Sequence, residues 1–151
     1  MIIGKEFEFA ASHVLPKYDG PCNRLHGHTF RLIVEIEGEP NSDERSSSYG
    51  MVMDFKDLKY FVEHGVLNVL DHSHLNDLGI YPTAENLIDW IWEQLEPNLF
   101  LHRIRLYESP TSYAERKKAS ITEIKTINEI RKAHGMVPII GGGPWVKKEN
   151  V

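Results

Sequence analysis

The residues best suited to chemistry gather in one short segment, PCNRLHGH, residues 21–28. It holds Cys22, the single cysteine of the chain, and His26 and His28 on either side of a glycine. Two histidines at positions i and i+2 of a strand project to the same side, about 7 Å apart at the backbone, which suits them to share one metal ion. Because zinc takes nitrogen and sulfur ligands, the segment predicts a zinc site, a reactive thiol, or both.

A third histidine comes from the preceding segment. Residues 5–13, KEFEFAASH, alternate as a half-buried strand does, with His13 on the aromatic face. Residues 26–38 alternate in the same way and place His26 and His28 on their apolar face. Three histidines would satisfy a catalytic zinc, which keeps its fourth position open for water or substrate. The alternative for each histidine is an ordinary core or surface residue, the usual role of a lone histidine.

Cys22 has three possible roles. It lies in a loop with two prolines and a glycine, LPKYDGPCNR, that could bring the thiol over the histidines. As a fourth ligand it would close the site into a structural one. Beside an open metal site it would be a reactive thiol, since a nearby metal and base favour the thiolate form. The third possibility is a small buried hydrophobic residue, and the spacing alone leaves all three open.

Acid–base groups follow in two further segments. In LDHSHLN, Asp71 could orient the imidazole of His72, and His72 could exchange a proton with the thiol of Cys22. Asp and Asn also cap turns, which is their more common use. Glu108 ends the apolar face of a strand predicted over residues 102–109. If buried, its carboxylate needs a partner such as the N–H groups of a heterocycle; otherwise the side chain turns to solvent.

Helical spacing separates the strands that carry these residues. Residues 55–70 have apolar side chains at steps of three and four, interrupted at Gly65, and Thr83 is a good N-cap for a second helix over 84–96. A short strand is predicted near Tyr113. The order of two strands, two helices and two strands predicts an α+β fold in which the helices cover one face of an antiparallel sheet.

The C-terminal segment is predicted to be an extension of this domain. Residues 120–123 form a capping-box pattern and isoleucines recur every third residue, which predicts one more helix over 120–135. We expect a domain over residues 1–117 and an extension over 118–151 that packs on the same domain.

Composition limits the partners. The formal charge of −5, with no run of Lys or Arg, argues against a mainly electrostatic binder of nucleic acid or of an anionic membrane. One cysteine cannot form an intrachain disulfide, and the N-terminal MIIGKEFEF reaches charged residues too soon for a signal peptide or a spanning helix. We therefore expect a reduced, cytoplasmic protein with a small-molecule or protein partner.

The motifs together resemble a known family. FAASH, CNRLHGH, MVMDF, LDHSHLN, PTAEN and YESPTS occur in this order across residues 3–116 and resemble the 6-pyruvoyl-tetrahydropterin synthase superfamily, in particular its 6-carboxy-5,6,7,8-tetrahydropterin synthase branch of queuosine biosynthesis. In that branch three residues typically separate the cysteine from His-Gly-His, as they do between Cys22 and His26, whereas the pyruvoyl enzymes usually have five.

The resemblance implies residue roles, a fold and a reaction. The implied zinc ligands are His13, His26 and His28, the catalytic residues are Cys22, Asp71 and His72, and the pterin-binding residues are Glu108 and Thr83. The implied fold is the tunnelling fold (T-fold), in which subunits join their sheets edge to edge into a barrel with active sites between subunits, here as a homo-oligomer, a hexamer built as a dimer of trimers. The implied reaction converts 7,8-dihydroneopterin triphosphate to 6-carboxytetrahydropterin, acetaldehyde and triphosphate with Zn²⁺ as cofactor.

Two other functions remain open at this point. One is the pyruvoyl synthase, which eliminates triphosphate but keeps the three-carbon side chain. The other is a non-catalytic oligomer that binds zinc or a pterin. Against the latter stand Cys22, Asp71, His72 and Glu108, because binding alone requires no proton-shuttling thiol.

Overall fold

The computed structural model describes residues 1–119, 136–137 and 146–147. The chain divides into two units, Met1–Lys117 and Lys118–Val151, and every predicted site residue belongs to the first. In the second, β6 (Met136–Val137) pairs antiparallel with β7 (Val146–Lys147). The predicted helix over 120–135 and the packing of the extension lie outside the described residues.

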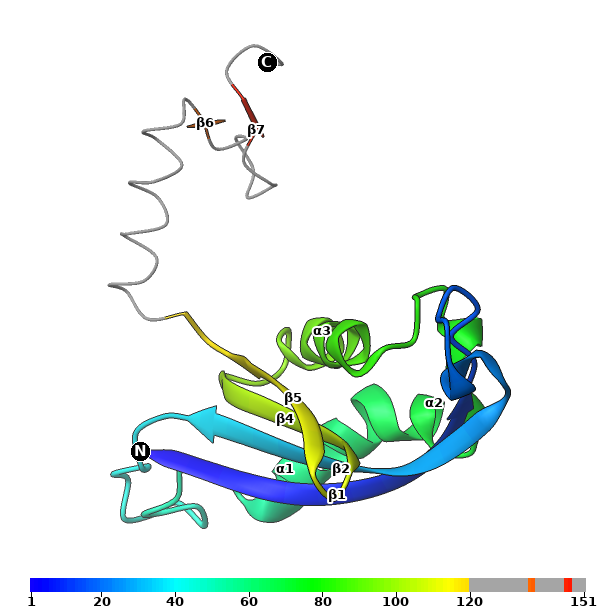
Figure 1. Cartoon of the computed structure of the whole chain (residues 1–151). Coiled ribbons are helices and arrows are strands. Elements are labelled where there is room, and N and C mark those ends of the chain that lie inside the picture. Colours follow the sequence, from blue (N-terminus) through cyan, green and yellow to red (C-terminus); the bar gives the residue numbers. More distant parts are fainter. Residues whose placement is uncertain (120–135, 138–145, 148–151) are drawn as a thin grey trace. The chain divides into compact units, whose positions relative to one another are not determined.

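A long hairpin forms the centre of the sheet (Figure 1). Strands β1 (Ile2–His13) and β2 (His26–Glu37) run antiparallel, with His13 directly opposite His26. Alternate residues of both strands are buried, as the sequence pattern predicts. The hairpin therefore carries the three candidate ligands at one end, beside the loop that joins its strands.

Two further strands complete the antiparallel part of the sheet. Strand β4 (Leu101–Ser109) pairs with β2, and β5 (Ser112–Lys117) pairs with β4. The register between them shifts around Glu108, which leaves this residue in an irregularity of the ladder. Such bulges re-aim a side chain, so the local break in pairing bears on where Glu108 points.

The sheet has a fifth strand that the sequence does not predict. Strand β3 (Ser73–His74) pairs parallel to β1, which gives the order β3-β1-β2-β4-β5. The sheet is therefore mixed, not purely antiparallel as expected. Two residues are too few to show a period of two in the sequence, which explains the difference.

The first helical segment has an irregular middle. Helix α1 (Phe55–Val62) continues as a π-helical turn, Glu63–Leu67, and ends as α2 (Asn68–Leu70). The predicted interruption at Gly65 falls inside the π-helical turn. A Cβ on Gly65 would lie 3.0 Å from the Cδ2 atom of Leu95, so the glycine allows this turn to pack closely against the second helix.

The second helix, α3 (Ala84–Leu95), begins where the sequence predicts. The Oγ1 atom of Thr83 accepts a hydrogen bond from the backbone N–H of Asn86 at 3.3 Å, which satisfies one of the free donors of the first turn. Both helices pack on one face of the sheet and form a single core with it. Burial of each large apolar side chain in this core contributes roughly 1.5–3 kcal/mol to the free energy of folding. Its most buried members include Phe30, Leu32, Leu58, Val62, Leu87, Ile91, Ile104 and Leu106.

The opposite face of the sheet is polar. Arg103 donates two hydrogen bonds to Glu35, at 2.6 and 2.9 Å, and the guanidinium of Arg31 lies 3.9 Å from the ring centroid of Tyr107. These groups remain partly exposed, so each pair contributes about 0–1 kcal/mol to stability. The observed α+β architecture, with helices on one face and a polar second face, is the predicted one.

Within residues 1–119, the part that carries the helices described above, no helix has both the length and the apolar character needed to cross a bilayer.

Candidate active site

Three histidines converge at the end of the β1–β2 hairpin. His13 faces His26 across the ladder, and His28 lies two residues further along β2 on the same face. One ring nitrogen from each histidine lies within 4.8 Å of the other two, and the Nε2 atoms of His13 and His26 are 3.0 Å apart. We call these residues the histidine triad. The structure thus brings all three predicted ligands together.

Backbone carbonyls orient two of the rings. The Nδ1 atom of His13 lies 2.8 Å from the carbonyl oxygen of Pro82, and that of His26 lies 2.7 Å from the carbonyl oxygen of Arg24. A carbonyl only accepts hydrogen bonds, so in each neutral ring Nδ1 carries the proton and Nε2 carries the lone pair. Two lone pairs 3.0 Å apart repel unless a cation lies between them.

The third ring supplies an unpartnered donor atom. The Nε2 atom of His28 is buried and is the one buried side-chain polar atom in the described part of the chain that has no hydrogen-bond partner. Burial lowers the pKa of His28, the neighbouring charges of His13 and His26 lower it further, and Glu108 opposes the shift. The ring is therefore held neutral, the form that ligates metals, and the triad fits an ion that accepts three imidazole nitrogens.

Glu108 lies beside the triad. Its Oε1 atom is 3.6 Å from Nε2 of His13 and 3.9 Å from Nε2 of His28. About a third of the side chain remains exposed, so the carboxylate borders the site and stays open to a ligand. A molecule bound at the triad would meet this carboxylate, which can accept hydrogen bonds from N–H groups.

Gly27 permits the close approach of the two strands at the triad. A Cβ at this position would lie 3.0 Å from the backbone carbonyl oxygen of Ala11, a contact that would push β1 and β2 apart. The glycine between His26 and His28 therefore keeps their strand close to the strand of His13.

A second pair of acid–base residues lies at the edge of β1. The Nδ1 atom of His72 is 3.0 Å from Oδ2 of Asp71, whose Oδ1 accepts a hydrogen bond from the backbone N–H of Ala10 at 3.0 Å. The Ala10 hydrogen bond, and then that of His72, hold the pKa of Asp71 below its usual value. His72 adopts a left-handed backbone conformation, φ 58°, and its side chain is 83% exposed. Asp71 therefore holds the His72 ring in one orientation, and the pair is directed outward.

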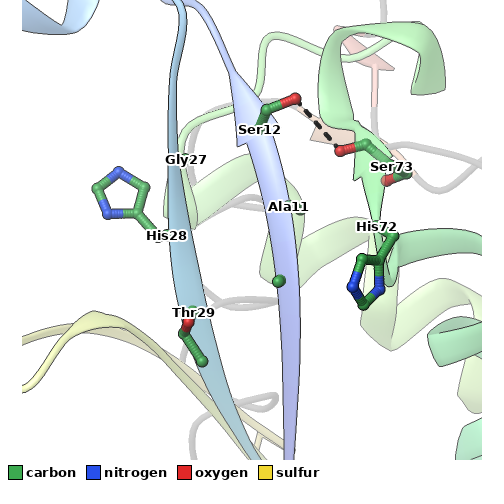
Figure 2. Close-up of a pocket in the computed structure, with 8 residues that line it drawn as sticks. Ala11, Ser12, Gly27, His28, Thr29, His72 and Ser73 are labelled. Atoms are coloured by element: carbon green, nitrogen blue, oxygen red, sulfur yellow. Dashed lines mark hydrogen bonds between the residues drawn. The ribbon is translucent and has the colours of Figure 1, made fainter.

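A cavity of about 450 Å³ separates the triad from this pair (Figure 2). His28 and His72 border it from opposite sides of β1 and β2. The volume is within the range of small-molecule sites. The other lining residues are small or carry hydroxyl groups: Ala10, Ala11, Ser12, Gly27, Thr29 and Ser73.

Cys22 belongs neither to the histidine triad nor to the Asp71–His72 pair. It lies in a short 3₁₀ turn, Pro21–Asn23, and its thiol is partly exposed. The group of converging metal-ligand atoms found in residues 1–119 contains the triad without this sulfur. Across the same residues the thiol makes no hydrogen bond or ion pair, to the Asp71–His72 pair or otherwise. The geometry of one chain thus gives no support to a fourth-ligand role.

A comparison with family models places the whole arrangement. Residues 2–119 match the family described as 6-pyruvoyl tetrahydropterin synthase. The chain belongs to this family. The resemblance carried by the six sequence motifs is thereby confirmed.

Several members of the family are close in sequence. A 6-carboxy-5,6,7,8-tetrahydropterin synthase from Synechocystis is 44% identical over 119 residues, covering 75% of this chain and 90% of the relative. One from Haemophilus influenzae is 34% identical over 137 residues, covering 75% and 96%. A protein from Dictyostelium discoideum named 6-pyruvoyl tetrahydrobiopterin synthase is 33% identical over 130 residues, covering 75% and 93%.

Solved structures of the family share the fold. The 6-pyruvoyl tetrahydropterin synthase of Caenorhabditis elegans superposes with a TM-score of 0.68 at 24% identity, covering 79% of this chain and 96% of that one. The Plasmodium falciparum protein gives 0.58 at 21% identity, covering 80% and 98%. The chain thus has the fold of a T-fold subunit, as predicted from the resemblance.

Some parts of the site have no clear signal in the sequence. The carbonyl groups of Pro82 and Arg24 act through the backbone, which every residue has, so the sequence could not single them out. Thr83, expected near the pterin, uses its hydroxyl as the cap of α3, while its neighbour Pro82 orients His13. A pterin contact of Thr83 stays a prediction.

Proposed function

We propose that this protein is a zinc-dependent 6-carboxy-5,6,7,8-tetrahydropterin synthase acting in queuosine biosynthesis. It would convert 7,8-dihydroneopterin triphosphate to 6-carboxytetrahydropterin, acetaldehyde and triphosphate. The relatives of that name at 44% and 34% identity support the reaction. The observation that carries the proposal is the convergence of three imidazole nitrogens, two of them oriented by backbone carbonyls, beside the carboxylate of Glu108.

The chemistry divides between a metal and the chain. Zinc held by His13, His26 and His28 would act as a Lewis acid on the side-chain oxygens of the substrate and acidify adjacent C–H bonds. Glu108 would accept hydrogen bonds from the pterin N–H groups and so fix the ring. Cys22, as thiolate, and His72 would move the protons, with Asp71 holding the His72 ring at Nδ1.

The carboxy reaction is preferred over the pyruvoyl reaction for one reason in the sequence. Three residues separate Cys22 from His26, the spacing typical of the carboxy branch. The 33% identity to the Dictyostelium pyruvoyl enzyme shows that overall similarity does not decide between them. The two reactions are distinguished by whether the product keeps the three-carbon side chain of the substrate.

A complete site is proposed to form between copies of the chain. Within residues 1–119 the Cys22 thiol contacts neither Asp71 nor His72, although a proton relay needs these groups around one substrate. The outer edges of β3 and β5 have no strand partner among the described residues, and such edges are available for pairing with another copy. We therefore propose a homo-oligomer, a hexamer as a dimer of trimers, located in the cytoplasm.

Product analysis tests the reaction. The purified protein, loaded with zinc, is incubated with 7,8-dihydroneopterin triphosphate, and the pterin products and acetaldehyde are identified by mass spectrometry. A carboxylated pterin with one equivalent of acetaldehyde supports the proposal. A product that keeps all three side-chain carbons would identify the pyruvoyl reaction, and unchanged substrate would favour a non-catalytic binding protein.

A further inference from the structure

One edge of β1 is held by a run of side chains from the segment that follows α2. Every second residue along this edge contacts a different side chain of that segment. Asp71 binds the backbone of Ala10, His74 contacts the side chain of Ser12, and Asn76 binds the backbone of Val14. His13, the most buried ligand of the triad, lies between the last two positions and is 1% exposed. We call these three side chains the β1 clasp.

The middle contact of the clasp joins two side chains. The Oγ atom of Ser12 lies 3.1 Å from Nδ1 of His74. It also lies 3.4 Å from the carbonyl oxygen of Ser73, the contact drawn in Figure 2. Ser12 precedes His13 directly, and His74 lies two residues beyond His72. This contact therefore connects the residue before a triad ligand with the segment of the Asp71–His72 pair.

The last contact replaces a missing strand. The pairing of β1 with β3 ends at Ser12 and His74, so Val14 has no strand neighbour on that side. The carboxamide of Asn76 supplies one: its Oδ1 accepts from the backbone N–H of Val14, and its Nδ2 donates to the backbone carbonyl, both at 2.9 Å. This double contact fixes the backbone immediately after His13.

The clasp acts on the side of His13 that faces away from β2. The ladder with β2 holds the His13 backbone on one side, opposite His26, and the Pro82 carbonyl fixes the rotation of the ring, but neither holds the side toward β3. A metal site tolerates displacements of only about 0.2 Å in ligand distance. Holding the residues before and after His13 therefore sets how well its Nε2 atom meets those of His26 and His28.

We propose that His74 and Asn76 are positioning residues, which hold His13 in the geometry of the triad and keep the Asp71–His72 pair at a fixed separation from it. The proposal rests on the proposed metal site only in that the triad binds a divalent ion. Neither residue touches the metal or the substrate in this role.

The first test compares two alanine variants of asparagines. Asn76→Ala should weaken zinc binding, measured by competition with a chromogenic chelator, by about 10-fold or more, the range found when supports of metal ligands are removed. Asn41→Ala is the matched control, because Asn41 is similarly half-buried, also makes two side-chain hydrogen bonds, and follows the end of β2 opposite to the triad. Equal zinc affinity in wild type and Asn76→Ala would overturn the proposal.

The second test uses His74 and also covers a failure of Asn76→Ala to fold. His74→Phe keeps a ring but loses the contact with Ser12, whereas His74→Asn keeps a polar atom near the position of Nδ1. Zinc affinity should fall in His74→Phe and be restored in His74→Asn. A loss of zinc affinity in both variants, or in neither, would contradict a positioning role. If His74 served only for packing, His74→Phe would keep its zinc affinity better than His74→Asn.

A metal-free measurement separates this inference from the proposed function. In the apoprotein, the ring N–H of His13 that donates to Pro82 should be protected from solvent exchange in ¹H–¹⁵N spectra. Asn76→Ala and His74→Phe should each shift this signal and speed its exchange, while Asn41→Ala leaves it unchanged. This measurement does not depend on zinc. A wild type that bound no zinc would contradict the proposed metal site but not the positioning of His13. An unchanged signal in both clasp variants would overturn the inference.

Discussion

The triad and the Asp71–His72 pair both contain histidines, but the two groups differ in burial and in what holds their rings. The triad is placed on the core-facing side of two strands, with His13 almost fully buried and its ring held by a backbone carbonyl. His72 is 83% exposed, sits in a strained left-handed conformation, and is held by a charged side chain. The triad is complete within one chain, whereas the pair faces outward without a reaction partner in residues 1–119.

The difference fits the roles proposed for the two groups. Ligands for an ion must converge with their lone pairs directed to one point, and the backbone carbonyls of Pro82 and Arg24 favour this because they fix the tautomers of His13 and His26. A proton-transferring imidazole must be able to change its charge, so it needs solvent or substrate access and a carboxylate that stabilises the charged form. The contrast predicts different consequences when each group is altered.

Removing a triad ligand should have the largest effect. His26→Ala leaves two imidazoles, too few for a stable zinc site, so metal content and synthase activity should disappear together. Metal analysis by atomic emission on the purified variant checks this. Full zinc occupancy in His26→Ala would show that the ligands are other residues.

Removing the thiol should affect the chemical step alone. Cys22→Ala should lower turnover by about 10²–10⁴-fold, the usual contribution of a general acid–base group, with zinc content and substrate affinity near those of the wild type. All three quantities are to be measured on one preparation. Loss of zinc together with activity would falsify the catalytic assignment and identify Cys22 as a ligand.

Mixing two inactive variants tests whether the pair serves the triad of another copy. By the proposed roles, His26→Ala loses the metal and His72→Ala loses proton transfer, so each variant alone should be inactive. When the two are unfolded together and refolded, about a quarter of the sites should combine an intact triad with an intact His72 from a neighbouring copy. Activity recovering to that fraction supports shared sites, whereas no recovery would place both groups in the same chain.

The smallest effect concerns pH. The pKa of Asp71 is lowered in the folded state, chiefly by the Ala10 hydrogen bond, so its contribution to stability is present above its ordinary pKa of 3.8 and is lost as pH falls through the lowered value. Wild type should therefore have a slightly higher urea midpoint than Asp71→Asn at pH 6. The gap should shrink progressively below pH 3.8. A gap that is unchanged at the lowest pH at which both proteins fold would argue against this origin.

The sequence predicts the metal site better than the rest of the active site, for a physical reason. The triad depends on two strands of regular alternation, so the faces of His13, His26 and His28 follow from a period of two residues. Glu108 ends an apolar row in the same way, and the structure places it beside the triad. These residues could be located without knowing how distant segments pack.

Other features depend on contacts that leave no local pattern. Strand β3 is two residues long, and its pairing with β1 depends on where the preceding helix α2 ends relative to the sheet. The role of Pro82 is a backbone carbonyl contact across 69 residues of sequence. The case of Cys22 is different, because the proposed site between copies would need a second chain to bring acid–base groups to this thiol.

The π-helical turn Glu63–Leu67 carries a consequence for insertions and deletions in this family member. A π-helical turn holds one residue more than an α-helical turn of the same rise, and each α-helical residue advances about 100° and 1.5 Å. Deleting one residue here should therefore give an α-helical turn and leave the elements that follow near their present places. Deleting one residue from the regular helix α1 would instead rotate everything that follows by roughly 100°. Asp71 would then leave Ala10, and β3 would lose its register on β1. The π-helical turn is thus the place in this helical segment that can lose a residue without moving the Asp71–His72 pair.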